Sequence, residues 1–211
     1  MVVRGFLFAK IVPKMYNLNM ENLYPQIKFI YSLPYDRLLN EYENKPFDEK
    51  QSREIRKYIK KLQPKWNKVN NSVCRTLEKV VGNKWREKEV NCYVVKHCKY
   101  RGISHPLTIK LDPDFDYVFD TLIHELTHIL VSYNFKKYKK IETKIKKQFP
   151  KENQRTILHI YIIFIELQVF KKLFNQTFIN KIIKRGLKFR IKRAFEIVLK
   201  EENNLKKLFE E

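Results

Sequence analysis

The chain has 211 residues, and 44 Lys and Arg against 23 Asp and Glu give it a formal net charge of +21. Hydrophobic residues make up 44% of it and only four residues are glycine, which argues against a disordered chain and against a turn-rich β-sandwich. This length predicts one folded domain with appendages.

The cysteines and the first residues bear on the cellular compartment. Cys74, Cys92 and Cys98 contain no CxxC pair, so they predict neither a disulfide framework nor a cysteine-based zinc site. The apolar run at residues 5–9 ends at Lys10 and is too short for a secretory signal. We therefore expect a cytoplasmic protein without a transmembrane segment.

The strongly basic balance has two interpretations. It raises the prospect of a nucleic acid or another polyanion as a partner, with the run from Lys181 to Arg193 as the expected patch. Alternatively, the lysines are ordinary solvated surface, because they are spread along the whole chain. The sequence leaves both open.

The first half of the chain changes character near residue 46. Residues 1–45 hold short apolar pieces between prolines, and we expect them to pack on or cap a core formed by residues 46–211. The pattern then becomes helical, with Pro64 as a break or a new start and Gly82 as the end of an apolar stripe.

Two β-like runs follow, at residues 91–97 and 103–111. We expect them to pair as a hairpin in which Pro106 confines the second strand to an edge. Asp112 and Pro113 then predict the N-cap and the first residue of an apolar helix that extends to Tyr133.

The remaining segments are also expected to be helical or exposed. Lys136 to Lys147 predict a solvated connection or surface helix, and residues 156–170, apolar nearly all round, predict a buried helix. Residues 177–209 predict one or two basic amphipathic helices with a break at Gly186. The predicted fold is α+β and mainly helical, with a small antiparallel sheet.

The motif His124-Glu125-Leu126-Thr127-His128 falls inside the apolar helix. Two histidines four residues apart lie on one face of a helix, so both can bind one metal ion. Glu125 would take a proton from a water whose pKa zinc lowers toward ~7. Without a metal, these polar residues would need hydrogen-bond partners in a core. The pattern therefore predicts a Zn²⁺ site in which Glu125 is the general base.

A catalytic zinc needs a third protein ligand and leaves a fourth position open. The helix at 156–170 offers Glu166, which we favour as the ligand, and His159, which is the alternative. The two residues are two turns apart, or ~10 Å, so both would not easily bind one ion. With Glu166 as ligand, His159 faces the same cavity and could stabilise an oxyanion. A buried ion pair is the other explanation for Glu166.

Other polar residues have weaker roles. Asp120 lies one turn before His124 and could orient its ring, or it could be a surface residue. Tyr117, Tyr133 and Tyr161 could stabilise an oxyanion, or they could belong to the core. His97 and His105, in the predicted hairpin, are expected to be structural or to face the substrate.

The HELTH motif followed by Glu166 on a later helix resembles the gluzincin branch of zinc metallopeptidases, and the short chain is most similar to the small minigluzincins. The resemblance covers residues 65–175 and implies a zincin-like fold. It also implies that His124, His128 and Glu166 bind zinc, that Glu125 is the general base, and that the strand at 103–111 pairs with a peptide substrate. The NExxSD signature of the thermolysin-like enzymes is absent around Glu166.

We therefore expect a zinc metallopeptidase that hydrolyses peptide bonds in peptide or protein substrates. One variant of this hypothesis has it act on proteins bound to nucleic acid, because the chain is so basic. The alternative is a basic module that binds nucleic acid or protein and holds a non-catalytic zinc ion.

Overall fold

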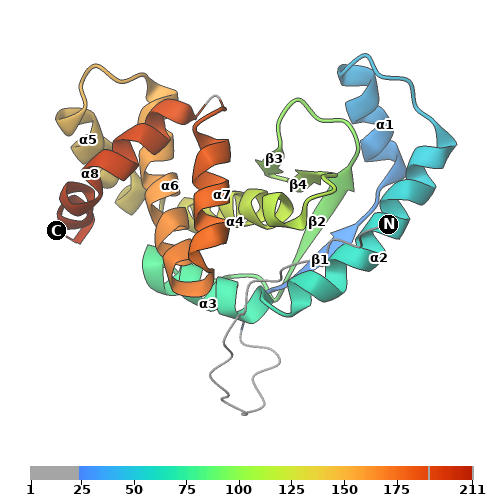
Figure 1. The fold of residues 1–211 in the computed structure, drawn as a ribbon, viewed down its shortest axis with the longest axis horizontal. Coiled ribbons are helices and arrows are strands. Elements are labelled where there is room, and N and C mark those ends of the chain that lie inside the picture. Colours follow the sequence, from blue (N-terminus) through green and yellow to red (C-terminus); the bar gives the residue numbers. More distant parts are fainter. Residues whose placement is uncertain (1–23, 190, 211) are drawn as a thin grey trace, which may run out of the picture.

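The structure is a computed structural model that describes residues 24–189 and 191–210. It is mainly helical with one small sheet, which confirms the α+β prediction (Figure 1). The strands are β1 (Gln26–Ile30), β2 (Glu89–Val95), β3 (Gly102–Ser104) and β4 (Leu107–Lys110). The helices are α1 (Leu33–Tyr42), α2 (Glu49–Asn67), α3 (Asn70–Val81), α4 (Phe115–Ser132), α5 (Phe135–Gln148), α6 (Gln154–Leu173), α7 (Gln176–Gly186) and α8 (Lys192–Glu210).

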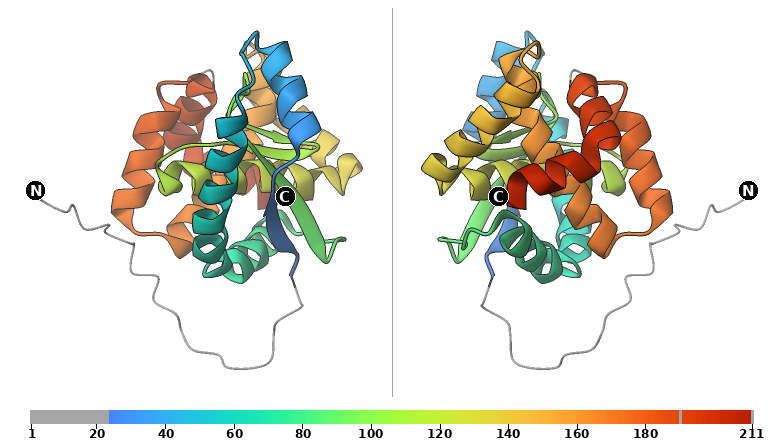
Figure 2. Two further views of the ribbon diagram at one scale, coloured as in Figure 1. Left: turned by 90° about the vertical axis from the view of Figure 1, so that its right-hand side faces the viewer. Right: turned by 90° about the vertical axis from the view of Figure 1, so that its left-hand side faces the viewer.

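The elements divide between two sides of the molecule. The sheet, α1 and α2 occupy one side and α5 to α8 the other, with α4 reaching between them (Figures 1 and 2). Helix α6 packs against α3, α4, α5, α7 and α8, which explains why its sequence is apolar on every face. The predicted buried helix at 156–170 is thereby confirmed.

The sheet is mixed, not antiparallel as we expected. Its order is β1-β2-β4-β3; β1, β2 and β4 are parallel, and only β3 runs the other way. The predicted hairpin of 91–97 with 103–111 is also wrong, because the hairpin joins β3 to β4 and Pro106 lies in its turn. Proline cannot donate a ladder hydrogen bond, so the run at 103–111 divides into two strands there.

Three local predictions have different outcomes. Gly82 ends α3 with φ of 74°, in the left-handed region that glycine adopts readily, as expected. The N-cap of α4 is Asp114 and not Asp112; its side chain accepts a hydrogen bond from the backbone N–H of Asp116 (3.1 Å). Pro64 does not break α2, where it lies exposed in the last turn, so water can reach the carbonyl that its missing N–H leaves free.

The later helices agree with the sequence pattern. The lysine-rich segment from residue 136 is the surface helix α5, and the basic C-terminal segment forms α7 and α8, separated just after Gly186. None of the helices in the described ranges is long and apolar enough to cross a bilayer.

Strand β1 comes from the expected N-terminal extension and is part of the sheet. Its outer edge is covered by side chains in place of another strand: the amide of Gln63 accepts from Phe29 N–H (2.9 Å) and donates to the Ile27 carbonyl (2.9 Å). Residues 1–23 of that extension, with the apolar run 5–9, lie outside the described residues.

Asn70, at the start of α3, connects the edge of β1 to α2 by hydrogen bonds. Its Oδ1 accepts from Trp66 Nε1 (2.8 Å) and from Ile27 N–H (3.3 Å), while its Nδ2 donates to the Pro25 carbonyl (2.9 Å). Asn70 is 1% exposed, so water cannot replace it as a partner for these groups.

We therefore expect Asn70→Ala to lower the free energy of unfolding by about 3 kcal/mol, because it leaves buried donors and an acceptor unpaired. Urea unfolding followed by circular dichroism measures the change. The control is Asn71→Ala, the same substitution at an exposed neighbour, which should cost less than about 1 kcal/mol. Equal losses in the two variants would contradict this role of Asn70.

Candidate metal centre

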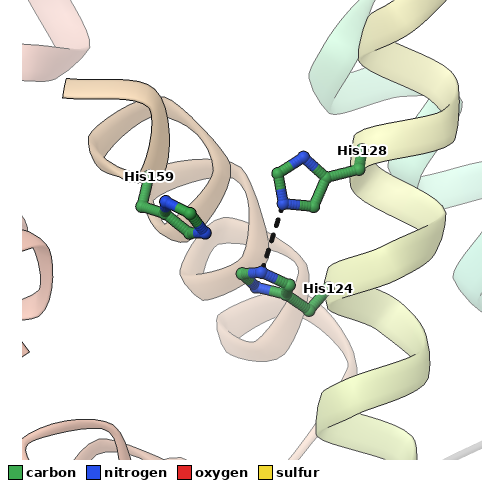
Figure 3. Close-up of side chains that lie close together, drawn as sticks. All are labelled: His124, His128 and His159. Carbon is green, nitrogen blue, oxygen red and sulfur yellow. Dashed lines mark hydrogen bonds between the residues drawn. The ribbon is translucent and has the colours of Figure 1, made fainter. Parts of the chain in front are cut away.

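Three imidazole rings meet between α4 and α6 (Figure 3). His124 and His128 lie one turn apart on α4, and His159 comes from α6; one ring nitrogen from each lies within 4.8 Å of the others. Nε2 of His124 is 3.2 Å from Nε2 of His128. Two nitrogens bound to one tetrahedral zinc ion lie roughly 3.3 Å apart. The cluster therefore fits a single metal ion.

Hydrogen bonds on the far side of two rings fix their orientation. Nδ1 of His124 lies 3.2 Å from Glu166 Oε2, and Nδ1 of His159 lies 2.8 Å from the carbonyl oxygen of Arg155. A carbonyl or carboxylate oxygen accepts, so each Nδ1 is assigned the ring proton. Nε2 of both rings then keeps its lone pair, as a metal ligand requires.

The protonation state of the rings also suits a metal. Burial, reinforced by the neighbouring imidazoles, lowers the pKa of His128 to about 2 and that of His159 to about 4. Burial likewise lowers the pKa of His124. All three rings are therefore neutral at pH 7, so protons do not compete with a metal ion for their nitrogens.

The sequence favoured Glu166 as the third ligand, and the structure places its carboxylate beside Nδ1 of His124. Glu166 lies behind His124 and not in the group of three nitrogens, so the arrangement favours His159 as the third ligand. The contacts show the reason: from His159 to Glu166 along α6, the contacts move along α4 from His128 and His124 back toward Asp120. His159 lies level with His128 and His124, while Glu166, two turns later, lies level with Asp120, one turn before His124.

Glu166 ends a buried chain of polar groups. Its carboxyl group hydrogen-bonds that of Asp120, whose Oδ2 accepts from Arg101 Nη2 (2.6 Å). Burial raises the pKa of Glu166 to about 8, and burial with the nearby Glu166 charge raises that of Asp120 to about 7. Two carboxyl groups in contact share a proton, so the pair carries about one negative charge beside Arg101.

The contacts among these polar groups decide between alternatives that the sequence left open for Asp120 and Glu166. Asp120 is buried, not on the surface, and it acts on His124 through Glu166. The cation near Glu166 is the partly buried Arg101, which comes from a different part of the sequence. The sequence pattern indicated Arg101 and Gly102 only as part of a connection between two β-like runs, and their position just before an edge strand was the available signal.

Glu125 lies against strand β3. A Cβ atom at Gly102 would come within 2.7 Å of the Cγ and Oε1 of Glu125 and of the Cγ2 of Thr121, so only glycine fits. Burial raises the pKa of Glu125, which moves it toward the range of a general base. The strand thus confines this carboxylate beside the histidines.

The histidines and Glu125 open into a cleft of about 590 Å³. One wall is β3 with the residues before it, the floor is α4 and α6, and the other wall is the connection between α7 and α8. The residues that line these surfaces are Lys99 to Ser104, Asp120, Thr121, His124, Glu125, His128, Arg155, His159, Glu166, Gly186, Phe189, Ile191 and Phe195.

The weaker candidates lie outside the cleft lining. Tyr117 packs under Arg185, Tyr133 hydrogen-bonds Glu87, and Tyr161 packs against Phe209. His97 and His105 are absent from the cluster among the described residues, and His105 Nδ1 lies 3.2 Å from Ser104 Oγ in the hairpin turn.

Comparisons with known proteins add nothing to this geometry: no protein family, no curated protein and no solved structure gives a significant match to the chain. The assignment of a function therefore depends on the residues of the cleft.

The two candidates for the third ligand predict different losses. His159→Ala should remove a ligand and weaken zinc binding by at least ~10³-fold, whereas Glu166→Gln should weaken it ~10- to 100-fold, because it only changes the partner of His124. Competition with a chromophoric chelator measures both dissociation constants. Loss of zinc in Glu166→Gln with full retention in His159→Ala would restore Glu166 as the ligand.

Proposed function

We propose that the protein is a zinc-dependent peptidase. The observation that carries the proposal is the cluster of His124, His128 and His159 beside Glu125 in one open cleft. Three neutral imidazoles suit zinc, and catalytic zinc sites use three protein ligands with an open position. Structural zinc sites are normally closed by four protein ligands, which disfavours the alternative of a non-catalytic site in a binding module.

A zinc ion held by these nitrogens would polarise a substrate carbonyl and lower the pKa of a water molecule to ~7. Glu125 accepts the proton of the water whose oxygen attacks the carbonyl carbon. It then passes this proton to the nitrogen of the peptide bond as the C–N bond breaks, so one carboxylate serves as base and acid in turn.

Strand β3 supports an extended peptide as the substrate. It hydrogen-bonds β4 on one side, while Gly102, Ile103 and Ser104 line the cleft. An unpaired strand edge binds an extended chain through backbone hydrogen bonds. A peptide added there would lie across Glu125 and the histidines.

The arrangement also bears on the resemblance to gluzincins. An HExxH helix beneath an edge strand and a ligand-bearing later helix support a zincin-like site. A histidine in place of the third-ligand glutamate departs from that branch, and Glu166 would instead hold the ring of His124.

Glu125→Gln tests the mechanism. It should keep one zinc ion per chain but lower kcat on a fluorogenic peptide library by at least ~10²-fold, because an amide cannot accept the proton. Zinc is measured by mass spectrometry and kcat by continuous fluorescence. Glu196→Gln, the same change on α8 away from the cleft, is the control and should leave both unchanged. Undiminished turnover in Glu125→Gln would refute the proposal.

Gly102→Ala tests how β3 positions Glu125. The new methyl group must displace the Glu125 carboxylate, so we expect kcat to fall at least ~10-fold while zinc stays bound. Gly82→Ala is the matched control: it strains a left-handed residue by about 1 kcal/mol but lies outside the cleft lining. Equal effects of the two variants on kcat would show that only stability had changed.

A further inference from the structure

The chain has a net charge of +21, but in parts of its surface the basic side chains form ion pairs with acidic residues. Acidic residues pair with four basic side chains of the predicted basic patch, Lys181 to Arg193: those of Lys181, Arg185, Lys192 and Arg193. Lys181 Nζ lies 2.6 Å from a carboxylate oxygen of both Asp114 and Asp116, and Arg193 Nη2 lies 2.7 Å from Glu152. This segment is thus a poor surface for a polyanion.

Helix α2 differs from this segment. After Glu54 no acidic residue occurs until Glu78, and the exposed basic side chains of α2 continue through this stretch. Among the described residues, Lys57, Lys60, Lys61 and Lys68 have no ion-pair partner. We define the α2 basic face as six exposed basic residues of this segment: Arg53, Arg56, Lys57, Lys60, Lys61 and Lys68.

The α2 basic face has a regular geometry. From Arg53 to Lys68, the C-cap of α2, the helix rises ~22 Å, and at 3.6 residues per turn the six side chains fall within an arc of roughly 140°. The opposite side of the helix packs on the sheet and α3 through Ile55, Leu62 and Trp66. In Figure 1, α2 lies on the side of the molecule opposite to α5 and α8.

The side chains of this face select among polyanions. The exposed residues of α2 include no large apolar side chain, whereas insertion into a membrane surface needs one. No aromatic residue is exposed on it either, and stacking on aromatic side chains is how single strands are bound. Phosphates of a duplex need only the cations.

The breadth of the face favours DNA over RNA. The major groove of B-DNA admits an α-helix, and basic residues on both flanks of that helix can reach the phosphates of both strands. The major groove of duplex RNA is too narrow for side chains to enter. We propose that the α2 basic face binds the phosphate backbone of duplex DNA. This inference is independent of the proposed peptidase activity.

The test compares two triple variants that remove the same charge. Lys57→Gln/Lys61→Gln/Lys68→Gln changes the α2 basic face, and Lys136→Gln/Lys140→Gln/Lys147→Gln changes α5, where these lysines are also exposed and without ion pairs among the described residues. Fluorescence anisotropy with a DNA duplex of about 20 base pairs, from about 50 to about 200 mM salt, gives Kd and its salt dependence.

We expect the α2 variant to raise Kd at least ~10-fold and to reduce the slope of log Kd against log salt by about 3, and the α5 variant to change Kd less than ~3-fold. Circular dichroism checks that both remain folded. Equal losses would show that net charge alone drives binding. That result, no binding at the lowest salt, or equally tight binding to duplex RNA or phosphatidylserine vesicles would overturn the proposal.

Discussion

The packing of α6 against α4 is the contact on which the site depends. It places His159 beside the two histidines of the HExxH motif and places Glu166 beside Nδ1 of His124, on the far side of that ring. Buried histidines on an apolar helix interface are costly unless each finds a partner. Here Glu166 and the carbonyl of Arg155 accept hydrogen bonds from Nδ1 of His124 and His159, which leaves Nε2 of both rings with its lone pair.

The carboxyl groups behind the histidines show how this interior tolerates charge. Asp120 and Glu166 share a proton, and Arg101 reaches them from the segment before β3. A chain of hydrogen bonds in a low-dielectric interior holds each member in one geometry. It also links the edge strand to the motif helix, because Arg101 donates to Thr121 on α4 as well (2.9 Å).

Close approach at Gly102 completes the cleft. With no side chain there, β3 lies directly on Glu125, and the carboxylate is confined between the strand and the histidines. The opposite wall shows a similar approach, since the ring of Phe195 lies where a Cβ of Gly186 would be. Two of the few glycines thus allow the walls of the cleft to form, and the α2 basic face lies on a separate element.

The sequence by itself determined the local features: the buried character of residues 156–170, the end of α3 at Gly82, and the shared face of His124 and His128, because these follow from spacing within one helix. Only the tertiary structure decided the parallel pairing of β2 with β4, the position of His159 beside the two histidines of α4 and that of Glu166 beside Nδ1 of His124. Spacing along one helix shows which residues share a face, but it does not show which residues of a neighbouring helix lie beside them. The packing of α4 against α6 determines which residues meet.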